Sequence, residues 1–330
     1  KKLVLDLRGN PGGLLKEAVS LSNLFVSKGE MIVSTKGKVK EWNKDYKATQ
    51  NPLDKDMPLV VLVNSGSASA SEIVSGVIQD LDRGVVIGQR TFGKGLVQTT
   101  RPLSYNSQLK VTTAKYYIPS GRCIQALDYS NRNADGSVGK VPDSLITKYT
   151  TKAGREVFDG GGINPDVKVE PIQLSDVAFN LGMKMLYFDF ATEYYHRNKE
   201  IPAVAEFNID DALFTEFKTW LDTKDFDYST DSEKVLEKLK EVAEEDKYFS
   251  RIEEEFAALE AQLKHNKAKD LEEFQKEVKD LLRGEIISRY YYQNGRIQAM
   301  LEDDGDVKKA LEILADGTEY NRILTETSSD

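Results

Sequence analysis

The chain has 330 residues, of which 40% are hydrophobic, and this is enough for two domains with proper cores. Its 54 acidic and 45 basic residues give a net charge of −9, which excludes the basic footprint of a nucleic-acid-binding protein. The longest apolar run falls far short of the roughly 20 residues that span a membrane, and the single cysteine, Cys123, excludes an intrachain disulfide.

Residues 1–170 alternate short apolar runs with helical patterns. The run at 3–7 predicts a strand that ends in the glycine-rich turn RGNPGG, and residues 14–28 have the spacing of a helix with one apolar face. Further along, strands are expected at 31–34, 59–63 and 85–88, a helix at 69–81, and loops or an edge hairpin at 36–55. Strands that alternate with helices predict right-handed βαβ crossovers and a largely parallel sheet.

The rest of the chain divides near Pro171. Two runs with β character, 96–100 and 109–118, precede a loop rich in Asn, Asp, Gly and Ser at 128–162. Beyond Pro171 the sequence is rich in Glu and Lys and has long 3.6-residue periods, which predict helices at 176–197, 210–222, 232–243, 248–265, 271–294 and 306–315. We therefore expect an α/β domain at 1–171 and an all-α helical domain at 172–330.

The first residues, KKLVLDLRGN, lack a Met and already lie inside a predicted core strand. We expect that the natural protein has further residues, including any targeting segment, before this point.

The stretch NSGSASASEI at 64–73 joins a predicted buried strand to a predicted helix. Ser69 and Glu72 have the S-x-x-E spacing of a capping box, which accounts for the pair without a catalytic role. A nucleophilic serine at the same position would gain from the positive end of the helix dipole. The small residues around it would also leave room for the backbone of a substrate.

A nucleophilic serine needs a base. The only histidines, His196 and His265, both lie in the helical part, where they are explained as ordinary helix residues. A Ser–His–Asp triad within the α/β domain is therefore excluded, and a Ser–Lys dyad is the main alternative. Lys94 in QRTFGKGLVQ is the best candidate, because burial would lower its pKa and one βαβ crossover would bring it beside Ser69.

Acyl transfer also requires hydrogen-bond donors for the developing oxyanion. The turn at 9–13 would present backbone N–H groups at the carboxyl end of a parallel strand, where such sheets bind ligands. Ala70 would add an N–H group at the start of the helix. The alternative explanation of RGNPGG is a tight turn that leads into a helix.

Residues 88–94, GQRTFGK, also match the phosphate-binding pattern G-x-x-x-x-G-K. Gly95 stands where that motif needs Ser or Thr for Mg²⁺, and the following LVQTT predicts a strand instead of a helix. Nucleotide binding is therefore not expected.

Five motifs occur in one order along the first half of the chain: VLDLRGNPGGLL, VLVNSGSASASEIVSGVIQD, GQRTFGKGLVQ, YYIPSGRCIQ and GGGINPDVKV. Together they closely resemble the C-terminal processing peptidases, the tail-specific Ser–Lys proteases of family S41. The resemblance covers residues 1–170 and extends weakly or not at all to the helical half. The loop DYSNRNADGSVGKVPDSL is similar to that of Bacteroidetes-type members.

The resemblance implies a nucleophile, a general base and a residue that orients the base, which are here Ser69, Lys94 and Gln98. Two acidic residues are implicated in some members and are secondary candidates, Glu72 and Asp80. The oxyanion donors map to the helix start and the glycine turn, namely Ala70 and one of Gly12 or Gly13. The resemblance does not decide between the two glycines.

The implied fold is a ClpP/crotonase-like α/β core, and the implied reaction is hydrolysis of a peptide bond near a protein's C-terminus through an acyl-enzyme, without a metal or nucleotide cofactor. Members usually work in the periplasm or cell envelope, on protein or peptide substrates with exposed C-termini. They normally carry a PDZ domain before the core, which grips the substrate by strand addition. We expect this sequence to begin after such a domain.

Two other classes of function remain as alternatives. A catalytically silent scaffold or binding protein would keep the fold, but it would have no need for Ser69, Lys94 and Gln98 together. A crotonase-like CoA enzyme would bind an adenine nucleotide, and only fold analogy supports it.

The helical half is a candidate for a gating lid, for a homo-oligomer contact or for docking an adaptor. The tyrosines at 290–292 are either part of such an interface or ordinary packing.

Overall fold

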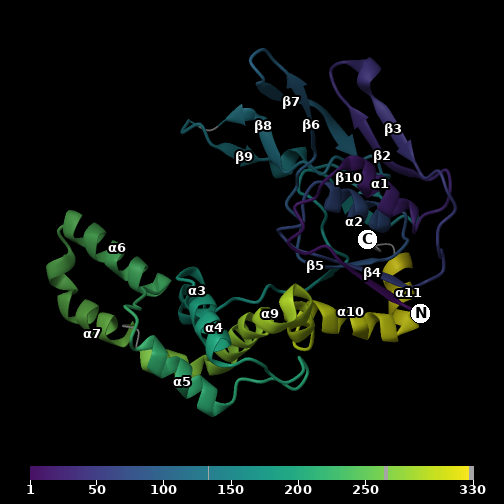
Figure 1. The fold of residues 1–330 in the computed structure, drawn as a ribbon. Helices are drawn as coiled ribbons and strands as arrows, with labels where there is room; N and C mark the ends of the chain where they lie inside the picture. The colour runs from purple at the N-terminus through teal and green to yellow at the C-terminus, as the bar shows by residue number, and fades with distance from the viewer. Residues whose placement is uncertain (133, 264–266, 327–330) are drawn as a thin grey trace. The chain divides into compact units, whose positions relative to one another are not determined.

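The computed structural model describes residues 1–132, 134–263 and 267–326 (Figure 1). The chain forms two compact units. The first consists of Lys1–Pro171 and the residues from Gly305 onwards, and the second is Ile172–Asp304. Within the described ranges, no helix combines the length and apolar character needed to cross a membrane.

A four-stranded parallel sheet forms the centre of the first unit, in the order β1-β4-β5-β12. Its strands are β1 (Leu3–Asp6), β4 (Leu59–Val63), β5 (Val85–Gly88) and β12 (Val167–Lys168). β4 pairs in parallel with both β1 and β5, as the predicted βαβ crossover requires. All five β4 side chains are fully buried, which is typical of a parallel strand that is covered on both faces.

Helices cover both faces of this sheet (Figure 1). They are α1 (Leu15–Asn23), α2 (Ala70–Asp80), α10 (Gly305–Ala315) and α11 (Gly317–Thr325). Val61 and Val63 of β4 belong to one apolar cluster with α1 and α2, whereas Val60 and Leu62 belong to another with α10 and α11. Successive side chains of a strand point to opposite faces, so one apolar strand supports both helical layers.

The position of α10 and α11 differs from the prediction of one helical domain at 172–330. Ile313, Leu314 and Tyr320 are buried against the sheet of the first unit. The Tyr320 hydroxyl also accepts a hydrogen bond from Leu59 N (3.0 Å) and donates one to Leu59 O (3.2 Å) at the start of β4. The sequence period shows that this segment has an apolar face but does not show which surface that face covers.

The remaining strands of the first unit are antiparallel. A second sheet has the order β3-β2-β7-β6, formed by β2 (Met31–Lys36), β3 (Lys44–Lys47), β6 (Leu96–Pro102) and β7 (Gln108–Tyr117). Two hairpins follow, formed by β8 (Leu127–Arg132), β9 (Val138–Lys140), β10 (Lys148–Thr150) and β11 (Glu156–Phe158). They lie where a long loop is predicted, because strands this short and polar carry no clear alternation. Short 3-10 helices lie at η1 (Lys40–Trp42) and η2 (Asp143–Leu145).

The second unit is helical, as predicted. Its elements are α3 (Asp176–Met183), α4 (Leu186–Arg197), α5 (Asp211–Leu221), α6 (Asp231–Glu245), η3 (Phe249–Arg251), α7 (Glu253–Leu263), α8 (Lys267–Glu273) and α9 (Gln275–Leu301). Aromatic side chains form much of its core, and the buried rings of Phe190 and Phe217 meet edge to face with centroids 5.1 Å apart. The single helix predicted at 176–197 is interrupted at Met185, whose φ of 59° is left-handed.

Two of the three tyrosines at 290–292 in α9 bond to other segments of the second unit. The Tyr290 hydroxyl donates to Asn198 O (2.8 Å), and Tyr291 hydrogen-bonds the carbonyl groups of Ile201 and Pro202, so both contribute to packing. Tyr292 is exposed. Of the two histidines, His196 lies on α4, and His265 lies outside the described residues.

Candidate active site

Ser69 occupies a sharp turn between β4 and α2. Its φ of 58° lies in the left-handed region, which residues other than glycine rarely adopt. Neighbouring contacts hold the turn: the Ser67 hydroxyl donates to Leu7 O (2.7 Å), and Ala68 N donates to Asn10 O (3.0 Å). A strained backbone that its surroundings fix in this way is a recurring feature of functional sites.

The Glu72 carboxylate joins this turn to the loop that carries the predicted base. It accepts hydrogen bonds from Ser69 N (2.8 Å), Thr91 Oγ1 (2.6 Å), Gly93 N (2.7 Å) and Lys94 N (2.9 Å). Glu72 is fully buried, and its pKa is raised by burial, against which these four hydrogen bonds act. The hydrogen bond from Ser69 N to the Glu72 carboxylate, which the predicted capping box requires, is therefore present. The same carboxylate also connects the motif that contains Ser69 to the motif that contains Lys94.

The Lys94 loop packs mainly through its backbone. Phe92 N donates to Ser67 O (3.0 Å), and the Thr91 hydroxyl accepts from Ile163 N (2.7 Å). Gly162 has a φ of 74°, and a Cβ there would lie 2.7 Å from both the carbonyl and the hydroxyl oxygen of Thr91. Gly162, the third glycine of GGGINPD, thus allows this segment to lie directly against the loop TFGKG.

The environment of the Lys94 side chain differs from the predicted one. It is exposed, although a buried lysine was predicted, because the glycines and backbone of the loop face the interior and the side chain faces out. In the described part of the chain, its ammonium group makes no hydrogen bond. The backbone of Lys94 nevertheless lies at the site, since the Tyr116 hydroxyl hydrogen-bonds Lys94 O and lies 3.3 Å from Ser69 Oγ.

Gln98 lies on β6, just after an irregularity in the pairing between β6 and β7. Its side chain is exposed, and it forms no hydrogen bond with any other residue that the structure describes. Its role in orienting Lys94 stays a prediction.

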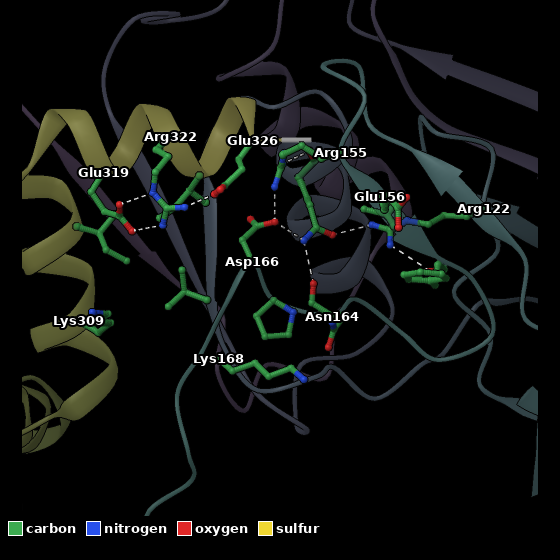
Figure 2. A pocket seen from close by; sticks show the side chains of 17 residues that line it. Arg122, Arg155, Glu156, Asn164, Asp166, Lys168, Lys309, Glu319, Arg322 and Glu326 are labelled. Atoms are coloured by element: carbon green, nitrogen blue, oxygen red, sulfur yellow. Dashed lines mark hydrogen bonds and ion pairs between the residues drawn. The ribbon is translucent and has the colours of Figure 1, made fainter. Parts of the chain in front are cut away.

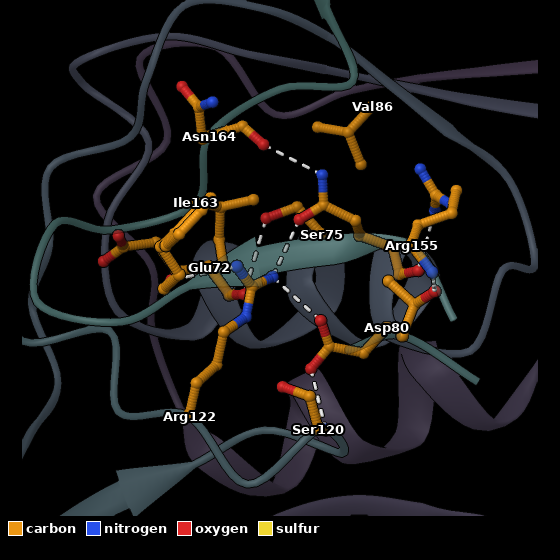
Figure 3. Close-up of polar contacts among 12 residues, drawn as sticks. Glu72, Ser75, Asp80, Val86, Ser120, Arg122, Arg155, Ile163 and Asn164 are labelled. Atoms are coloured by element: carbon orange, nitrogen blue, oxygen red, sulfur yellow. Dashed lines mark hydrogen bonds and ion pairs between the residues drawn. The ribbon is translucent and has the colours of Figure 1, made fainter. Parts of the chain in front are cut away.

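Asp80 lies at the far end of α2 from Ser69, a distance of about 16 Å along the helix axis. Its carboxylate accepts from Arg122 Nη2 (2.8 Å) and Ser120 N (2.9 Å), in the buried polar cluster of Figure 3. Burial raises the pKa of Asp80, while the Arg122 guanidinium acts in the opposite direction. This position suits a residue that anchors the helix and does not allow direct contact with Ser69.

The glycine turn lies against the start of α2. Gly12 has a φ of 89°, and a Cβ there would lie 2.6 Å from Ala70 N and 2.9 Å from Ser69 Cβ. Gly12 N donates to Asn10 Oδ1 (2.9 Å). By contrast, the N–H groups of Gly13 and Ala70 have no acceptor among the residues described.

A mostly apolar cavity of about 210 Å³ lies next to this turn, between α1 and α2. Its lining includes Gly12, Gly13 and Ala70 together with the side chains of Leu7, Leu14, Ala18, Leu21 and Val74. Glu17 is the charged residue of the lining. A cavity of this kind, directly beside Ser69, is suited to an apolar side chain of a bound peptide.

A larger cavity of about 570 Å³ lies elsewhere in the first unit, beside α10 and α11 (Figure 2). None of the predicted catalytic residues lines it. Its arginines are held in ion pairs, such as Arg155 with Asp166 (2.6 Å) and Arg322 with Glu319 (2.7 Å). We therefore place the candidate site at Ser69.

Two residues of the site had no role in the sequence analysis, namely Thr91 and Tyr116. Thr91 lies inside the motif GQRTFGKGLVQ, and Tyr116 lies inside YYIPSGRCIQ. Membership of these motifs was the available signal, but their hydrogen bonds join segments far apart in sequence, which only the fold reveals.

Comparison with known protein families agrees with this arrangement. Residues 1–128 match the model of peptidase family S41, and residues 177–314 match the model described as the C-terminal helical domain of a probable PDZ-protease. The N-terminal part of the chain is therefore similar to peptidase family S41, and the segment that follows is similar to the C-terminal helical domain of a probable PDZ-protease.

Individual relatives are similar to parts of the chain. A carboxy-terminal-processing protease of Bartonella bacilliformis is 51% identical over 127 residues, which are 38% of this chain and 29% of that protein. A probable CtpA-like serine protease of Staphylococcus aureus is 36% identical over 222 residues, or 63% of this chain and 42% of that protein. The chain thus spans less than half the length of these curated relatives.

Among solved structures, a photosystem II D1 C-terminal processing protease is 34% identical. The match covers 53% of this chain and 36% of that one, with a TM-score of 0.38.

Proposed function

We propose that this chain is the catalytic part of a serine endopeptidase that cleaves proteins near their C-termini through an acyl-enzyme on Ser69. The observation that carries the proposal is the Glu72 carboxylate, which binds Ser69 N and Lys94 N at once. This shared contact supports the assignment of the serine and the lysine, from two separate motifs, to one site. The similarity of residues 1–128 to peptidase family S41 supports the same reaction.

In the proposed reaction, Ser69 Oγ attacks the scissile carbonyl carbon while the neutral Lys94 amine takes the hydroxyl proton. The tetrahedral intermediate collapses, the C–N bond breaks, and the Lys94 ammonium returns the proton to the leaving amine. Water then attacks the ester, again with Lys94 as base, and frees Ser69. Rotation of the flexible side chain would bring the exposed Lys94 amine to Ser69 Oγ, and Gln98 would orient it there.

For the oxyanion, we propose Gly13 N–H and Ala70 N–H as the donors. Gly12 N–H is already donated to Asn10 Oδ1, whereas the other two groups are not engaged within the described residues. Gly12 instead allows the turn to lie close to the start of α2, because a side chain there would collide with Ala70 N. The Gly12–Asn10 hydrogen bond supports the choice of Gly13, which the sequence left open.

The apolar cavity between α1 and α2 supports a preference for an apolar side chain at the residue whose carbonyl is attacked. It adjoins Ala70 and Gly13, the proposed oxyanion donors. A carbonyl held by these donors therefore places the adjoining side chain next to the cavity. Substrates would be proteins or peptides with exposed C-termini.

For the whole protein, we propose a location in the periplasm or cell envelope and a contact with an adaptor or a second copy through the helical unit. The location follows the family resemblance alone.

A stripe of exposed apolar side chains on α6 supports the proposed contact of the helical unit, with Val235, Leu239 and Val242 on one helical face. Replacing Leu239 by Glu should weaken such a contact, and measurement of the molar mass in solution would test this.

The proposed activity is tested by incubating the full-length protein with an unfolded substrate that has an apolar C-terminus and identifying the products by mass spectrometry. Cleavage should disappear with Ser69→Ala and persist with Ser65→Ala, which removes an exposed hydroxyl from the same stretch. Cleavage that survives Ser69→Ala would reject Ser69 as the nucleophile. Binding of the substrate without any cleavage would favour the scaffold alternative.

A further inference from the structure

Tyr116 is a buried residue near the end of β7, next to the loop that carries Lys94. Its side chain is 4% exposed, and its backbone N–H donates to Gly95 O (3.0 Å). The hydroxyl at the end of the ring contacts two groups of the site: it hydrogen-bonds Lys94 O, and it lies 3.3 Å from Ser69 Oγ. Strand, lysine loop and nucleophile turn therefore meet at one phenol oxygen.

The number of hydrogens restricts what this hydroxyl does. A phenol has one hydrogen to donate and lone pairs to accept with, whereas a carbonyl oxygen only accepts. While the hydrogen is directed to Lys94 O, the phenol oxygen can accept the hydrogen of Ser69. When Ser69 loses its proton, the phenol hydrogen can turn to Ser69 Oγ. Burial raises the pKa of Tyr116, so the hydroxyl stays protonated and does not act as a base.

We propose that Tyr116 is a positioning residue for the nucleophile: its hydroxyl fixes Ser69 Oγ relative to the Lys94 loop. This inference rests on the proposed peptidase function and adds a residue to its site. The Glu72 carboxylate fixes the same two segments by accepting from Ser69 N and Lys94 N, which are backbone groups and not the reacting oxygen. Tyr116 instead contacts the oxygen that reacts, so its removal should affect the chemical step more than substrate binding.

The test compares Tyr116→Phe with Tyr117→Phe in the full-length protein. Both changes remove a single hydroxyl from adjacent residues of β7 and keep the ring. Successive side chains of a strand point to opposite faces, and the Tyr117 ring contacts Lys36, whose Nζ lies 4.9 Å from the ring centroid. Peptide cleavage is measured as kcat and KM, and reactivity of the serine as the rate of labelling by a fluorophosphonate. Thermal unfolding is measured first, so that all assays are run where each variant is folded.

Tyr116→Phe should lower kcat by about 10- to 100-fold and leave KM nearly unchanged, since a misplaced reacting group costs rate more than affinity. The fluorophosphonate rate should fall in parallel, while Tyr117→Phe should match the wild type. Wild-type kcat and labelling rate in Tyr116→Phe would overturn the positioning role but leave the proposed function intact. An inactive, unlabelled wild type would instead reject the proposed function itself.

Discussion

At the scale of single residues, the site depends on close approach of backbone to backbone. Gly12, Gly93 and Gly162 all have positive φ and lie where a Cβ would collide with a neighbouring segment. The polar side chains at the centre, Glu72 and Thr91, are bonded mainly to backbone N–H groups. The geometry of the candidate site thus depends on how closely three segments of main chain pack together.

Gly12→Ala should abolish peptidase activity, because the new Cβ would lie 2.5 Å from Ala68 O and displace the turn that carries Ser69. Gly29→Ala is the matched control, since Gly29 has a similar φ of 91° but open space around it. Activity and thermal stability of both variants are measured. If Gly12→Ala kept wild-type activity, the glycine turn would not be part of the site.

Glu72→Gln should reduce activity by at least about 100-fold, because the amide NH₂ group would face the donors that the carboxylate now accepts from. The melting temperature should fall as well, since buried donors lose their acceptor. Glu41→Gln, at an exposed position, should change neither quantity. Full activity in Glu72→Gln would show that this carboxylate does not set the distance between the two segments.

At the scale of elements, α2 is anchored at both ends. Glu72 connects its first turn to the Lys94 loop, and Asp80 connects its last turn to Arg122 of the YYIPSGRCIQ motif. The positive end of the α2 dipole lies at Ser69, which is the N-cap residue of the helix. The direction and depth of α2 therefore determine the position of Ser69, the proposed nucleophile.

Asp80→Ala should destabilise the first unit by about 3–5 kcal/mol, because it leaves the buried Arg122 guanidinium without its carboxylate. Unfolding by denaturant measures this change. Asp231→Ala, which removes a carboxylate from an exposed pair with Lys234, should leave the transition where it is. A transition in Asp80→Ala that matched the wild type would contradict the anchoring role.

The C-terminal helices are the second covering layer of the sheet. Ile313→Ala should destabilise the first unit by about 2–5 kcal/mol, because Ile313 is buried against the sheet. Leu311→Ala on the same helix is the control, since Leu311 is largely exposed and should tolerate the change. Equal melting temperatures for the two variants would contradict the packing of α10 on the sheet.

Periodicity and motifs predicted the elements around the site well and the connections between them poorly. The buried strand at 59–63 and the helix after Ser69 are confirmed, because an unbroken apolar run and a strong helical period are local signals. The hairpins within 128–162 were missed because their strands are short and polar. The attachment of α10 and α11 to the sheet was missed because it depends on contacts between distant residues, such as Leu59 and Tyr320, which are 261 positions apart.

At the scale of the whole molecule, two units with different architectures share one chain. The α/β unit contains every predicted catalytic residue, and the helical unit has its own aromatic core. The chain leaves the α/β unit at Pro171 and returns to it at Gly305, so the helical unit is inserted between β12 and α10. The family match at 177–314 runs through α10, which packs on the sheet of the α/β unit.

The proposed function depends above all on Ser69 as the nucleophile and on Lys94 as the group that activates it. The most direct measurement is the rate at which a fluorophosphonate modifies the full-length protein and its Lys94→Ala variant, with the modified residue identified by mass spectrometry. Modification should occur at Ser69, and its rate should fall strongly in Lys94→Ala while the protein remains folded. Modification at another residue, or an undiminished rate without Lys94, would contradict these roles.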